Sequence, residues 1–302
     1  LQAMGRVAPI VWTILIANLC NLALNWVLVF GHLGVPPMGV SGAAIATMCS
    51  RWVMPISLLA FAWPSLRVRL APWQASSFDR ASLLGLFRVG APIGLQYLLE
   101  FGVFGLVGLL MGMLGTNQIA GHQVAINLAS LTFNVPLGIS SATAVMVGHA
   151  VGAEDAIEAR HSAVAGLWLA IGFMTASAVT FLTLPLALAR LYTQVPEVLA
   201  VAALLIPLAG VFQIFDGIQV TAIGVLRGLG DTRTPMLVNI LGFWLLGLPV
   251  SIYLGFTTHH GPAGLWWGLV AGLVVVALVL LLRVRVKLAR GARRLSYEAV
   301  SN

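Results

Sequence analysis

Eight apolar segments, each long enough to cross a bilayer, divide this chain of 302 residues and leave only short polar connections between them. A helix of about 20 apolar residues spans the hydrocarbon core of a membrane. We place the segments at residues 8–30, 41–63, 90–114, 118–147, 163–189, 199–226, 235–256 and 264–282. A content of 60% hydrophobic and 8% charged residues excludes an ordinary soluble domain. The sequence therefore predicts an all-α, polytopic membrane protein with eight transmembrane helices.

The basic residues indicate how the chain is oriented. Fourteen of the sixteen arginines and lysines fall on one side of the membrane if the amino end is inside, whereas Arg190 falls outside and Arg51 lies within the second segment. Such a bias is typical of cytoplasmic loops, so we expect both termini in the cytoplasm. The net charge of +7 is concentrated in these loops and in the last residues, and it favours contact with anionic membrane lipid over nucleic acid.

Two parts of the sequence resemble each other and suggest an internal repeat. Gly5-Arg-Val-Ala-Pro9, an apolar span and Gly39-Val-Ser-Gly42 match Gly230-Asp-Thr-Arg-Thr-Pro235, an apolar span and Gly261-Pro-Ala-Gly264. Secondary transporters are commonly built from such weakly similar halves. The spacing predicts a repeat of six spans, so we expect the chain to be the carboxy-terminal part of a twelve-helix, two-lobe transporter. The expected parts are 1–64, the last two helices of the first lobe; 65–88, a cytoplasmic linker; 89–290, the six-helix second lobe; and 291–302, a cytoplasmic tail.

Two acidic residues, Glu100 and Asp216, lie deep inside apolar segments, while the other seven acids lie in or near polar connections. A charge at the centre of a membrane helix costs at least about 2.5 kcal/mol and usually marks an ion or proton pathway. The alternative is a protonated acid that is hydrogen-bonded to a neighbouring helix. We interpret the pair as a candidate site for Na⁺ or H⁺.

Amide and hydroxyl side chains follow helical spacing in several spans. Stripes of this kind either line a hydrated cavity or bind neighbouring helices together at about 0.6 kcal/mol per hydrogen bond. Asn18, Asn21 and Asn25 form one stripe in the first span. The candidate cavity-lining residues are Gln96, Gln123, Asn127, Phe133, Asn134, Phe212, Gln213 and Gln219. The two phenylalanines among them offer ring faces to an aromatic cation. Trp266 and Trp267 are predicted to anchor the chain at a membrane interface.

Three stretches resemble a known family. Val89-Gly-Ala-Pro-Ile-Gly-Leu-Gln-Tyr-Leu-Leu-Glu100 is similar to the seventh helix of the multidrug and toxic compound extrusion (MATE) family, NorM-like branch. The run from Ala120 to Ala142 resembles the eighth helix. The stretch Phe212-Gln-Ile-Phe-Asp-Gly-Ile-Gln219, with the following Leu226-Arg-Gly-Leu-Gly-Asp-Thr-Arg-Thr-Pro235, resembles the tenth helix and the turn after it.

The resemblance implies a secondary active antiporter of the bacterial inner membrane, which exports cationic amphiphilic compounds in exchange for Na⁺ or H⁺. It also implies that Glu100 and Asp216 form the cation site of the second lobe. We expect a monomer with no cofactor other than the coupling ion.

Other classes of membrane protein fit the residues less well. A flippase for a lipid-linked precursor needs a basic cavity for pyrophosphate, but Arg51 is the one basic residue near a span centre. An intramembrane enzyme needs a reactive constellation, whereas Gly138-Ile-Ser-Ser-Ala142 lacks the serine-protease pattern and Asp216 is the single aspartate of its helix. We therefore predict a transporter and not an enzyme.

Overall fold

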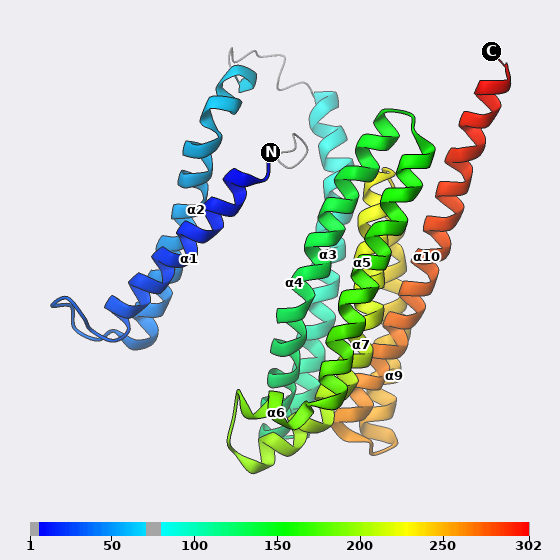
Figure 1. The fold of residues 1–302 in the computed structure, drawn as a ribbon. Coiled ribbons are helices and arrows are strands. Elements are labelled where there is room, and N and C mark those ends of the chain that lie inside the picture. The colour runs from blue at the N-terminus through cyan, green and yellow to red at the C-terminus, as the bar shows by residue number, and fades with distance from the viewer. Residues whose placement is uncertain (1–5, 71–79, 302) are drawn as a thin grey trace. The chain divides into compact units, whose positions relative to one another are not determined.

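The computed structural model describes residues 6–70 and 80–301, and within these ranges the regular secondary structure is helical (Figure 1). Eight helices are long and apolar enough to cross a membrane, which confirms the predicted number of spans. The chain divides into two compact units, Leu1–Leu83 and Leu84–Asn302, which are described separately below.

The first unit contains the helices α1 (Ala8–Leu28) and α2 (Gly39–Leu70). The two helices approach closely at Gly42, where an added Cβ would lie 2.7 Å from the backbone oxygen of Leu28. Part of the predicted asparagine stripe joins them, because the Asn21 amide donates to Ser50 Oγ at 3.1 Å. Asn18 and Asn25 instead donate to carbonyls one turn earlier in their own helix. In this unit, helix–helix binding accounts for at least one member of the stripe.

The second unit holds the other six membrane-length helices, and its centre is α7 (Pro196–Gly228), which packs against α4, α5 and α10. The flanking elements are α3 (Arg80–Leu114), α4 (Thr116–Gly152), α5 (Ala156–Thr183), α6 (Pro185–Arg190) and α10 (Gly261–Ser301). Both α2 and α3 continue into the predicted linker 65–88, of which residues 71–79 lie outside the described ranges.

Direct backbone contact holds α4 against α7. Ser140 Oγ donates to the backbone oxygen of Val220 at 2.6 Å. A Cβ added at Gly224, one turn further along α7, would lie 2.4 Å from the Ser140 backbone oxygen. Small residues of this kind let membrane helices pack closely, so Gly224 sets the distance between the two helices.

The helix α5 starts and stops earlier than the predicted span 163–189. The Asp155 carboxylate caps its start by accepting from the backbone N–H groups of Ile157 and Glu158. At the other end the helix stops at Thr183, two residues before Pro185, which has no N–H to continue it. A polar cap and a proline therefore determine where α5 begins and ends. Hydropathy locates the apolar stretch but does not locate these ends.

The seventh span is built of four consecutive pieces. These are α8 (Arg233–Asn239), the π-helical η3 (Ile240–Gly247), α9 (Leu248–Ile252) and the π-helical η4 (Tyr253–Thr257). Pro249 lies at the start of α9, and its ring disfavours regular α-helical hydrogen bonding to the preceding turn. Wide π-helical turns are rare and frequently occur at functional sites.

The prediction that Trp266 anchors the chain at an interface is wrong. Its side chain is fully buried, and its indole N–H donates to Nδ1 of the buried His122 at 3.2 Å. Phe212 packs edge-to-face against the same indole, with 5.9 Å between the ring centroids. Trp267, by contrast, is 45% exposed, as a residue at a lipid-facing position is expected to be.

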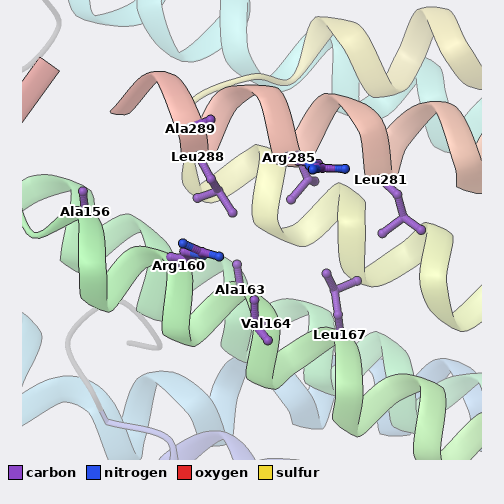
Figure 2. Close-up of a pocket in the computed structure, with 10 residues that line it drawn as sticks. Ala156, Arg160, Ala163, Val164, Leu167, Leu281, Arg285, Leu288 and Ala289 are labelled. Atoms are coloured by element: carbon purple, nitrogen blue, oxygen red, sulfur yellow. The ribbon is translucent and has the colours of Figure 1, made fainter. Parts of the chain in front are cut away.

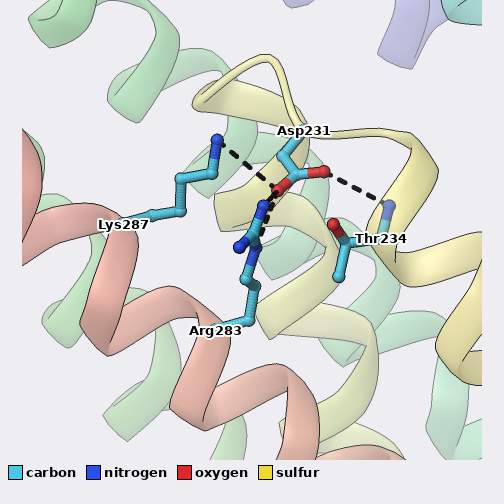
Figure 3. A network of polar contacts seen from close by, with 4 residues as sticks. All are labelled: Asp231, Thr234, Arg283 and Lys287. Atoms are coloured by element: carbon cyan, nitrogen blue, oxygen red, sulfur yellow. Dashed lines mark hydrogen bonds and ion pairs between the residues drawn. The ribbon is translucent and has the colours of Figure 1, made fainter.

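An ion-pair cluster ties the turn between α7 and α8 to α10 (Figure 3). Asp231 Oδ2 accepts from Arg283 Nε at 3.0 Å and Nη2 at 2.8 Å, and Lys287 Nζ lies 3.6 Å from the same oxygen. Asp231 Oδ1 accepts from the backbone N–H of Thr234 at 3.2 Å. Burial raises the pKa of Asp231, but the hydrogen bonds from Thr234 and Arg283 outweigh it and hold that pKa below its usual range.

We expect Asp231→Asn to lower the stability of the second unit by roughly 1–3 kcal/mol at neutral pH, because it leaves a partly buried cation without its partner. Since the folded-state pKa is depressed, the charged form stabilises the fold above the ordinary aspartate range near pH 4 and loses this effect as the pH falls through the folded value. Thermal unfolding in detergent at several pH values measures the difference. Glu154→Gln, an exposed acid at the same end of the unit, is the matched control. A difference between Asp231→Asn and the native chain that stays constant down to acidic pH would contradict the assignment.

Candidate functional site

Glu100 lies at a junction of three helices. Its Oε1 accepts from the Gln219 amide of α7 at 3.3 Å, and its Oε2 accepts from the Asn239 amide of α8 at 3.1 Å. The Gln219 amide also lies 3.3 Å from Asn239 Oδ1, so the three side chains close a ring of contacts. The ring joins α3, α7 and α8 at one carboxylate.

Asp216 is the second acid of the site and lies one turn before Gln219 on α7. It is half-buried and close enough to Glu100 for the two charges to interact. In the described part of the chain, no hydrogen bond reaches its carboxylate. Two carboxylates at this separation repel each other in a low-dielectric environment unless a cation or a proton neutralises them.

The chemistry of the surrounding donors fits a hard cation. Gln219 Oε1 is buried and has no hydrogen-bond partner among the described residues, so it is an oxygen atom that could coordinate a cation. The carboxylates of Glu100 and Asp216 and the amide of Gln219 supply oxygen atoms, which are the ligands that hard cations prefer. Glu100, Asp216 and Gln219 are therefore the residues that could hold Na⁺, and either acid could accept a proton.

Arg227 supplies positive charge near Glu100, which the sequence did not indicate. Its charge interacts with the Glu100 carboxylate, although no ion pair joins the two residues in the described ranges. Its Nη1 donates to the Tyr97 hydroxyl at 3.2 Å, and the guanidinium lies 5.2 Å from the centroid of the Tyr97 ring. Tyr97 therefore orients the arginine through a hydrogen bond and a ring contact.

Three further candidates are buried within the unit. Gln96 is 2% exposed and precedes Glu100 by one turn of α3. Gln213 Oε1 accepts from Thr132 of α4 and, at 3.1 Å, from Ser177 of α5, so this amide binds three helices together. Phe212 is 3% exposed and packs between Phe104 and Trp266.

The candidates on α4 lie elsewhere. Gln123, Asn127 and Asn134 are exposed on the second unit, and Phe133 beside them is half-buried. Gln123 donates to Asn127 Oδ1 at 3.4 Å, and Asn134 donates to the Ser130 carbonyl at 2.8 Å. The structure does not bring them into the Glu100 network. Exposed amides along a membrane span require water or other polar groups in front of them, because lipid offers no partners.

Besides Arg227, two residues of the site were missed by sequence reasoning. Asn239 is 2% exposed and donates directly to Glu100. It was detectable as a lone amide in an apolar span, by the argument applied to the other asparagines. Trp244, in the π-helical segment that follows, donates from its indole N–H to the Leu99 carbonyl at 3.2 Å and fixes α3 next to the site.

Comparison with known proteins gives one consistent result. The MatE family model matches residues 92–253, which include Glu100, Asp216 and Asn239. The multidrug resistance protein PmpM of Pseudomonas aeruginosa is 38% identical over 97% of this chain and 62% of its own length. The multidrug resistance protein NorM of Burkholderia vietnamiensis is 36% identical over 95% of this chain and 63% of its own length. The chain thus spans less than two thirds of these relatives.

Solved structures share the fold. The crystal structure of the eukaryotic MATE transporter AtDTX14 matches with a TM-score of 0.80 at 24% identity, over 97% of this chain and 66% of that one. An outward-facing multidrug resistance MATE transporter matches with a TM-score of 0.81 at 20% identity, over 93% of this chain and 62% of that one. At these identities the structural likeness concerns the fold alone.

Proposed function

Since this chain belongs to the MatE family, we propose that it forms the cation-coupled part of a multidrug efflux antiporter, which exports cationic amphiphilic compounds in exchange for Na⁺ or H⁺. The similarity to PmpM and NorM, both named multidrug resistance proteins, supports the export function. The observation that carries the coupling is the network in which Glu100, Gln219 and Asn239 join three membrane helices, with the charge of Asp216 close enough to interact with Glu100.

The network couples ion binding to helix position. When the site is empty, the charges of Glu100 and Asp216 repel each other and favour separation of α3 from α7. A bound Na⁺ or proton removes the repulsion, so that α3, α7 and α8 draw together through Gln219 and Asn239. The coupling ion therefore stabilises one arrangement of these helices over another.

Export requires the compound and the ion to favour opposite arrangements, so that binding of one promotes release of the other. On this proposal, the exposed amides Gln123, Asn127 and Asn134 of α4 line the path of the exported compound, and Phe133 offers a ring face to an aromatic cation. We further propose that the protein lies in a bacterial inner membrane with both ends of the chain in the cytoplasm, in agreement with the distribution of its basic residues.

Dye export from proteoliposomes tests the proposal. The gene product that contains this chain is reconstituted, and export of a cationic dye is followed under an imposed sodium gradient and, separately, an imposed proton gradient. Export driven by at least one gradient is expected, with no response of an anionic dye. Equal dye movement with and without both gradients would contradict antiport.

Asn239 should tune the affinity of the site for its ion. Asn239→Leu removes a hydrogen bond to a charged carboxylate, a loss of about 1.5–3 kcal/mol, so we expect the ion concentration for half-maximal export to shift by roughly tenfold or more. The control is Asn117→Leu, which replaces an exposed amide in the first turn of α4 and should leave the ion concentration for half-maximal export unchanged. A normal ion dependence in Asn239→Leu would remove this residue from the site.

A further inference from the structure

A cavity of about 610 Å³ lies between the start of α5 and the last membrane turns of α10, apart from the Glu100 network (Figure 2). Its walls include Arg160, Val164 and Leu167 of α5 and Leu281, Arg285 and Leu288 of α10. The α4–α5 turn and the end of the α10 span lie at the same end of the second unit (Figure 1). The cavity therefore opens where the helices reach the membrane boundary.

Two arginines, one from each helix, face this space. Figure 2 shows the side chains of Arg160 and Arg285 lying between the two helices. Both residues are exposed, and in the described ranges neither forms an ion pair with an acidic side chain. A pair of guanidinium groups without acidic partners provides up to ten N–H donors for an anion, and phosphate is the anion that their geometry suits.

Three basic residues of α10 point in two directions, two of them towards Asp231 and one towards the cavity. Arg283 and Lys287 are four residues apart, share one face of the helix and both bind Asp231. Arg285 lies midway between them in the sequence and so points from the opposite face, towards the cavity. Its charge is therefore not used by the ion-pair cluster that ties α10 to the α7–α8 turn.

On the membrane-interior side of the two arginines, the cavity is lined by apolar side chains. Along α5, Val164 and Leu167 follow Arg160 by one and two turns towards the membrane interior. Along α10, which runs in the opposite direction, Leu281 lies one turn on the interior side of Arg285. The arginines thus lie nearer the boundary than Val164, Leu167 and Leu281, which is the order of headgroup and acyl chain in a phospholipid.

We propose that this cavity binds an anionic glycerophospholipid, with its phosphate between Arg160 and Arg285 and an acyl chain along Val164, Leu167 and Leu281. Basic pockets between membrane helices are known to hold such headgroups. The lipid bridges α5 and α10 at a point where no hydrogen bond between described side chains joins them. The two arginines repel cationic compounds, so the site is distinct from the proposed transport path.

Native mass spectrometry of the purified chain in detergent tests this binding. Phosphatidylglycerol is titrated against phosphatidylcholine with the same acyl chains, and sn-glycerol 3-phosphate serves as the soluble phosphate probe. We expect a preference for phosphatidylglycerol, which falls by about fivefold for each arginine lost, or roughly 25-fold in Arg160→Gln/Arg285→Gln. Arg190→Gln/Arg233→Gln removes the same charge from other exposed positions and should keep the preference.

Three results would overturn the proposal. Equal affinity of the native chain for the two lipids would exclude headgroup recognition. A loss of preference in Arg190→Gln/Arg233→Gln as large as in Arg160→Gln/Arg285→Gln would show that net charge alone is responsible. Displacement of the lipid by equimolar glycerol phosphate would show that the site binds phosphate without using its apolar wall. Circular dichroism of each variant verifies that it retains its helices.

Discussion

Replacing Glu100 by Gln, or Asp216 by Asn, is expected to reduce ion-driven dye export to the level seen without a gradient, a loss of roughly 100-fold for a coupling energy at the upper end of the usual range. Either substitution removes one of the two charges that the coupling ion neutralises. With a single acid left, the site no longer distinguishes the empty and occupied arrangements of α3, α7 and α8.

The amide substitutions separate coupling from packing, because they keep shape and hydrogen-bonding capacity while removing charge. If the acids only bind helices together, the amides should serve about as well, since hydrogen bonds within membranes contribute only about 0.6–1.7 kcal/mol. Glu197→Gln removes the charge of an exposed acid in the first turn of the same helix, α7, and should leave export intact. Native rates in both variants under either gradient would leave the site without a role in coupling.

Gly224→Ala is expected to destabilise the second unit by about 3 kcal/mol, the upper part of the usual range for overpacking. The new methyl group would lie 2.4 Å from the Ser140 backbone oxygen and 2.5 Å from its hydroxyl oxygen. Backbone cannot move aside as a flexible side chain can, so α7 must shift away from α4. Because α7 also carries Asp216 and Gln219, export should fall as well. Unfolding in mixed detergent micelles measures the stability.

Gly172→Ala is the matched control for this substitution. Gly172 lies within α5, is exposed, and has nothing within 4 Å of the added Cβ. Alanine is the better helix former by about 1 kcal/mol in water, so stability should stay unchanged or rise slightly. A similar loss in both variants would show that the cost comes from glycine replacement in general and not from the contact between α4 and α7.

Much of the fold could be predicted from hydropathy, since the bilayer imposes a length and a composition on every span. All eight predicted spans correspond to membrane-length helices. The ends of the helices could not be predicted as well. In α5, for example, side-chain capping by Asp155 and the missing N–H of Pro185 determine where the helix begins and ends. The division of the seventh span into α-helical and π-helical pieces has no hydropathy signal at all.

Part of the candidate site could be predicted from the sequence, for a physical reason. Glu100 and Asp216 stand out because a buried charge is costly in a membrane, and the structure places them within electrostatic reach of each other. Asn239 and Arg227 reach Glu100 from more than 120 residues away in the sequence, and helical spacing carries no information about such contacts. Trp266 was misassigned because burial against His122 depends on which face of α10 meets α4.

Infrared difference spectroscopy of the chain itself tests most directly whether Glu100 and Asp216 bind the coupling cation. The absorption of protonated and ionised carboxyl groups is recorded while sodium is added at fixed pH and while the pH is changed without sodium. The account predicts a carboxyl signal that responds to at least one of the two cations, is reduced in Glu100→Gln and in Asp216→Asn, and is unchanged in Glu197→Gln. A carboxyl signal that responds to neither cation, or that persists in full in the variant carrying both Glu100→Gln and Asp216→Asn, would contradict it.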